Sequence, residues 1–167
     1  MSDSFELKPI AQDSLGKALE KARRYRLLND PVQAESICLD ILAVDDDNQD
    51  AVIEYILAMA DQFAGARSSP SKHAILEYVG RLDDEYQQAY YTGIVCEREA
   101  LGFLERGQAA GFAYIGLREA MEWYEKAEKQ RPEGNDDALL RWNACVRTIQ
   151  REKLRPPPEH DIELPLD

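Results

Sequence analysis

Residues 30–48 have the sequence DPVQAESICLDILAVDDDN, and this stretch decides how the rest of the chain is interpreted. Apolar residues recur along it at intervals of three and four, the period of an amphipathic helix: Ala34, Ile37, Cys38, Ile41 and Leu42. Asp30 and Pro31 form the usual start of a helix, as the capping residue and the first helical residue. Three aspartates and Asn48 close the stretch with a composition typical of turns. The pattern predicts a helix over 32–44 with a defined beginning and end.

The same helical period continues on both sides of this stretch. It predicts helices over 15–29, 32–44, 51–63, 71–83, 84–106, 114–131 and 136–153. Prolines fall outside these segments, as expected because proline interrupts a helix interior. No segment shows the alternation of a β-strand. We therefore expect an all-α chain of about seven helices.

The positions of the prolines and of the segments rich in small residues predict how the chain is divided. We expect an N-terminal arm over 1–13, a helical domain over 14–153 and an extended, proline-rich acidic tail over 154–167. The small residues of 107–116, GQAAGFAYIG, predict a loop inside the helical domain.

Composition and charge exclude several classes of protein. The chain has 32 acidic and 20 basic residues, and its net charge of −12 argues against nucleic-acid binding. The longest apolar run, 55–60, is too short to span a membrane, and we expect no signal peptide because the first residues lack an apolar core. Three widely spaced cysteines, Cys38, Cys96 and Cys145, argue against a disulfide framework or a zinc site and favour a reducing, cytoplasmic location.

A second stretch, residues 115–135, aligns with the first when Ala34 is superposed on Ala120. Its sequence, IGLREAMEWYEKAEKQRPEGN, resembles the tetratricopeptide repeat family, whose second-helix signature it keeps at Ala120, Tyr124, Ala127 and Pro132. In the first helix of a pair, Ala22 and Gly93 stand where that family has a small residue. The resemblance implies a right-handed array of stacked helix pairs, an α-solenoid. A generic helical bundle is the alternative.

The resemblance also implies a concave groove that binds an extended peptide or a helix. Transferred position by position, the groove residues are Leu19, Arg23, Arg26 and Leu27 from the first pair, Ile53 and Leu57 from the second, Tyr90, Ile94 and Arg98 from the third, and Asn143 and Arg147 from the last helix. The same transfer places further residues beside them: Asp50, Asp61, Gln87, Glu97, Leu139 and Val146. Four arginines around apolar residues predict a ligand with acidic groups and an apolar anchor. The alternative is that these arginines pair with carboxylates of the chain itself.

These patterns favour a non-catalytic protein-interaction module whose partner is a protein or peptide. A small secretion-type chaperone of the same architecture is one alternative. An enzyme or metal protein, with titratable groups gathered near His73 or a cysteine, is another. The acidic run Asp45–Asp50 lacks EF-hand spacing, because Asp50 stands at the glycine position and Ile56 at the position of the bidentate glutamate. We expect no cofactor and no metal, and the sequence leaves the oligomeric state open.

Overall fold

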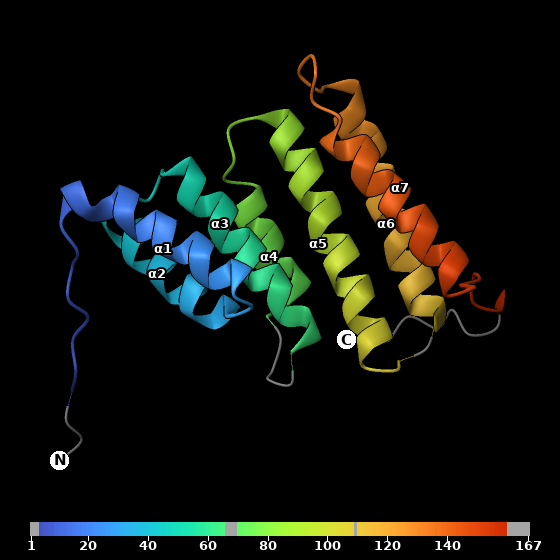
Figure 1. Cartoon of the computed structure of the whole chain (residues 1–167), viewed down its shortest axis with the longest axis horizontal. Coiled ribbons are helices and arrows are strands. Elements are labelled where there is room, and N and C mark those ends of the chain that lie inside the picture. The colour runs from blue at the N-terminus through green and yellow to red at the C-terminus, as the bar shows by residue number, and fades with distance from the viewer. Residues whose placement is uncertain (1–3, 66–69, 109, 160–167) are drawn as a thin grey trace.

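The computed structural model describes residues 4–65, 70–108 and 110–159, and all regular structure in these residues is helical (Figure 1). The seven α-helices are α1 (Leu15–Leu27), α2 (Pro31–Val44), α3 (Gln49–Ala60), α4 (Lys72–Val79), α5 (Glu85–Glu105), α6 (Ala110–Lys129) and α7 (Asp137–Arg151). Two short 3-10 helices, η1 (Gln12–Ser14) and η2 (Asp61–Ala64), precede α1 and follow α3. The prediction of an all-α chain with about seven helices is confirmed for these residues.

The helix ends follow the capping residues of the sequence. Asp30 Oδ1 accepts a hydrogen bond from the Gln33 amide at 3.3 Å, and Asn48 Oδ1 accepts one from the Ala51 amide at 3.0 Å. Each of these bonds satisfies an amide that has no partner inside the first turn of its helix. The turns after α1 and α2 are therefore fixed by short-range chemistry, and they bring α1, α2 and α3 together in chain order.

The prediction of a loop over 107–116 is wrong from residue 110 onward, because α6 begins at Ala110. The small residues there serve close packing between helices. A Cβ atom on Gly116 would lie 2.9 Å from the Cβ of Ala100 in α5. The absence of a side chain at Gly116 therefore lets the backbones of α5 and α6 approach each other, which is a use of glycine that a local sequence pattern does not distinguish from a turn.

Helices that follow each other in the chain pack against each other, and α1 also contacts α3, which contacts α5. Figure 1 shows the result as a row of helices in chain order from α1 to α7. Buried side chains form two apolar clusters, one mainly within α1 to α4 and one within α5 to α7. Helix α5 contributes to both, since Val95 belongs to the first cluster and Cys96 to the second.

The two ends of the described chain differ. Residues 4–11 form an extended arm that runs away from the helices (Figure 1), with Phe5 and Leu7 fully in solvent. At the other end, Leu154 is buried in the second cluster, and a Cβ on Gly111 would lie 2.9 Å from Pro157. The first residues of the predicted extended tail therefore pack on the helices, whereas residues 160–167 lie outside the described part.

Candidate functional site

Ion pairs join α1 to α3 on the face predicted to carry the groove. Arg26 Nε donates to Glu54 Oε1 at 2.7 Å, and Arg26 Nη1 donates to Asp61 Oδ2 at 3.3 Å. Glu54 is 4% exposed, and Arg23 Nε lies 3.8 Å from its other oxygen. Although burial alone would lower the pKa of Arg26, the hydrogen bond that Arg26 donates to Glu54 and the charges of both carboxylates, Glu54 and Asp61, raise it. Arg26 is therefore charged, and its hydrogen bonds to Glu54 and Asp61 hold α1 against α3 and η2.

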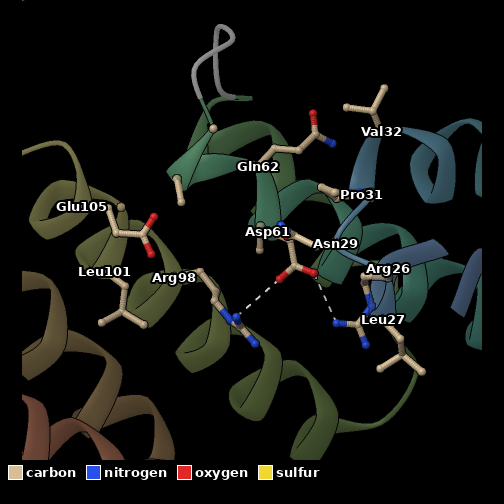
Figure 2. A pocket seen from close by; sticks show the side chains of 14 residues that line it. Arg26, Leu27, Asn29, Pro31, Val32, Asp61, Gln62, Arg98, Leu101 and Glu105 are labelled. Carbon is tan, nitrogen blue, oxygen red and sulfur yellow. Dashed lines mark hydrogen bonds and ion pairs between the residues drawn. The ribbon is translucent and has the colours of Figure 1, made fainter. Parts of the chain in front are cut away.

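Further ion pairs continue this row across α5 to α7. Arg98 Nη1 of α5 lies 3.5 Å from Asp61 Oδ1, so Asp61 sits between two arginines (Figure 2). On the other side of α5, the buried Glu97 accepts hydrogen bonds from Arg141 of α7 and from the Tyr124 hydroxyl of α6. Arginine–carboxylate pairs thus link α1, α3 with η2, α5 and α7 in a row. The interpretation that the predicted arginines pair within the chain holds for Arg23, Arg26 and Arg98.

A pocket of about 690 Å³ opens where the end of α1, the start of α2, η2 and the second half of α5 meet (Figure 2). Its floor carries Asp61 between Arg26 and Arg98. The wall from α1 and α2 carries three apolar side chains, Leu27 (82% exposed), Pro31 and Val32, with Asn29 of the connecting turn beside them. The opposite wall comes from α5 and carries Arg98, Leu101 and Glu105. An apolar wall that faces a charged one can orient an amphipathic ligand.

The structure brings together three of the predicted groove residues, Arg26, Leu27 and Arg98, in this pocket. Leu19 and Ile94 lie in the core, and three more are partly buried against the apolar clusters: Ile53, Leu57 and Tyr90. Arg23 stands beside the pocket, half exposed, near Glu54. Asn143 lines a separate hollow of about 270 Å³ between α6 and α7, with Trp142 and Leu139, and Arg147 is exposed on α7.

The transferred positions missed much of the pocket wall. Pro31, Val32 and Glu105 line it, as do backbone and side-chain atoms of η2. These residues belong to helix ends and to a connecting turn, whereas the family pattern concerns helix faces. One local feature of the sequence did point to this wall. Leu27 and Leu28 are two apolar residues at the end of α1, directly after a turn that carries Arg24 and Arg26.

Among the described residues, the structure does not gather reactive side chains around His73, the histidine considered above as a centre of enzyme or metal chemistry. His73 is exposed and lies 3.5 Å from Glu77, one turn further along α4. Within the described ranges no group of three or more histidine, cysteine, aspartate or glutamate side chains is arranged to hold a metal ion.

None of the helices described is long and apolar enough to cross a membrane.

The three cysteines are expected to be unreactive in the folded chain. Cys38, Cys96 and Cys145 are fully buried, and burial raises the pKa of each thiol to about 12. Because the thiolate is the reactive form, an aromatic disulfide reagent at about pH 8 should label none of them within minutes. After addition of denaturant, all three should react. Rapid labelling of the native protein would show that a helix interface opens readily.

The candidate site is thus an open, amphipathic pocket with a paired charged floor, and the fully buried thiols lie apart from it. The pocket can bind and orient a ligand through apolar contact and through the exposed part of Arg98. Comparison of the chain with protein-family models, with curated proteins and with solved structures found no match.

Proposed function

We propose that this chain is a non-catalytic protein-interaction module, built as an array of helix pairs similar to tetratricopeptide repeats, that binds a peptide or helix in the pocket. The order of packing supports the array, because each helix contacts its neighbours in the chain and α1, α3 and α5 form a second set of contacts. The buried free thiols suit a reducing compartment, so we propose a cytoplasmic location.

The observation that carries the proposal is the exposed apolar wall of the pocket. Leu27 is 82% exposed beside Pro31 and Val32, at the mouth of a concave site. An isolated exposed leucine needs no explanation, but an apolar wall on one side of a pocket of about 690 Å³ offers burial to a bulky side chain. Such burial contributes about 1.5 to 3 kcal/mol for one large apolar side chain.

The charges of the pocket decide which part of the ligand is the anchor. Two arginines, Arg26 and Arg98, are balanced by two carboxylates, Asp61 and Glu105. The net field therefore does not select a strongly acidic ligand, and the apolar group is the anchor. Arg98 has donor capacity left, because its ion pair to Asp61 is long and its side chain is 37% exposed. We assign to Arg98 the recognition of one acidic group or terminal carboxylate of the ligand.

A peptide-display selection tests the proposal. Random peptides selected on the folded chain should share a bulky apolar residue near one acidic group. The Leu27→Glu variant should bind them at least about 10-fold more weakly, since it removes the apolar contact and adds a charge. Leu28→Glu is the matched control, because Leu28 is also exposed (70%) but does not line the pocket. Failure to select any peptide, or equal loss in both variants, would contradict the proposal.

A further inference from the structure

The extended N-terminal arm exposes two large apolar side chains. Phe5 is 91% exposed and Leu7 is 93% exposed, the highest values among the exposed large apolar residues described. Ile10, at the base of the arm, packs against the first apolar cluster and holds the arm to the start of α1. Two large apolar side chains left in solvent so close together would gain free energy if a partner covered them.

The arm is amphipathic in its extended form. Side chains alternate along an extended chain, so Phe5 and Leu7 point to one side and Glu6 and Lys8 to the other. Residues two apart in an extended chain are separated by about 7 Å. The arm therefore presents an apolar edge and an opposite edge with one negative and one positive charge.

The pocket has two different walls, whose residues Figure 2 labels, and each wall matches one edge of the arm in chemistry. Its α1–α2 wall, with Leu27 and Val32, suits the apolar edge, and its α5 wall carries Arg98 and Glu105. These two residues are about 10 Å apart along the axis of α5, a span that long side chains at Glu6 and Lys8 can bridge. The negative residue of the arm would meet Arg98, and the positive residue would meet Glu105.

We infer that the arm of one copy of this chain occupies the pocket of a second copy, so that two copies exchange arms in a dimer. This inference rests on the proposed function of the pocket as a peptide site. In Figure 1 the arm runs away from its own helices, and the pocket lies at the opposite end of α1, so the arm does not fill the pocket of its own chain. A two-fold exchange fills both pockets and covers both arms, and it leaves no open contact for further growth.

The test is the oligomeric state of the full chain, measured by sedimentation velocity over a wide range of concentration. The wild-type chain should dimerise. The double variant Phe5→Glu and Leu7→Glu should weaken the dimer by about 100-fold or more, because two apolar side chains lose their burial. Leu27→Glu should also weaken it, whereas the control Leu28→Glu should dimerise like the wild type. All four positions are exposed, so we expect the variants to fold like the wild type, which circular dichroism checks.

A charge exchange tests the register of the arm. Lys8→Glu should weaken the dimer, and adding Glu105→Lys to the same chain should restore it. A dimer that is unchanged by Phe5→Glu with Leu7→Glu would overturn the inference. If Glu105→Lys does not restore the dimer weakened by Lys8→Glu, the proposed pairing of Lys8 with Glu105 is wrong.

The remaining outcomes separate this inference from the proposed function. A monomeric wild-type chain whose pocket still binds selected peptides would overturn the exchange and leave the peptide site intact. A monomeric wild type whose arm-deleted form binds a synthetic arm peptide would show that the arm fills its own pocket, which also overturns the exchange. A dimer that depends on the arm, in a chain whose arm-deleted form still selects no random peptide, would support the exchange and contradict the wider peptide-binding function.

Discussion

Gly93→Ala is expected to destabilise the folded chain by about 3 kcal/mol, although alanine is the better helix former. The added Cβ would lie 2.5 Å from Cε1 and 2.7 Å from Cδ1 of Tyr124. The ring cannot move aside, because it is fully buried between α5 and α6 and its hydroxyl donates a hydrogen bond to Glu97 at 2.5 Å. The clash therefore separates α5 and α6, the two longest helices among the described residues.

Urea unfolding followed by circular dichroism measures this effect, and Gly16→Ala is its control. A Cβ on Gly16 in α1 would meet nothing within 4 Å. The same substitution should there stabilise the chain by about 0.5 to 1 kcal/mol, since it only restricts the unfolded state and favours the helix. Opposite signs at the two glycines are the expected result. Equal stability of Gly93→Ala and wild type would show that α5 and α6 do not approach each other this closely.

Arg141→Ala is expected to cost about 3 to 5 kcal/mol of stability, because it leaves a buried carboxylate without its cation. Glu97 is 3% exposed, and it receives a hydrogen bond from Arg141 Nε at 3.1 Å and a second from the same guanidinium. Tyr124 donates to it as well, but a hydroxyl does not neutralise a charge. The loss should therefore be far larger than for an exposed ion pair.

Two further variants make this expectation specific. Arg151 lies on the same helix and pairs with Glu152 in solvent, so Arg151→Ala should change stability by less than about 0.5 kcal/mol. The double variant Glu97→Leu with Arg141→Leu should recover part of the loss, because an apolar pair needs no charge compensation. If Arg141→Ala is as mild as Arg151→Ala, the Glu97 carboxylate is not held away from water as the structure shows.

The positions of the helices could be predicted from the sequence because they depend on local patterns. The apolar period places α2, and Asp30 and Asn48 fix where α2 and α3 begin. The segment 107–116 could not be predicted in the same way. A glycine such as Gly116 can mark a turn or a close contact, and the choice depends on Ala100, which is in another helix. Only the assembled structure supplies that neighbour.

The candidate site was predictable only in part. Positions on helix faces led to Arg26, Leu27 and Arg98, which the structure brings into one pocket. The same reasoning included Leu19 and Ile94, which lie in the core, because a periodic pattern does not say how far a neighbouring helix covers a face. The α2 and η2 walls depend on how helix ends meet across distant parts of the chain.

The placement of α5 in both apolar clusters has a consequence for motion. Val95 and Cys96 are adjacent in the chain, yet they fasten the helix to opposite halves of the molecule. A change in the tilt of α5 would therefore alter the packing of both clusters at once. The pocket lies where α5 meets the first half of the molecule, since Leu27 comes from α1 and Glu105 from α5. A molecule bound there would contact α1, α2 and α5 at once, and its binding would therefore stabilise their packing against one another.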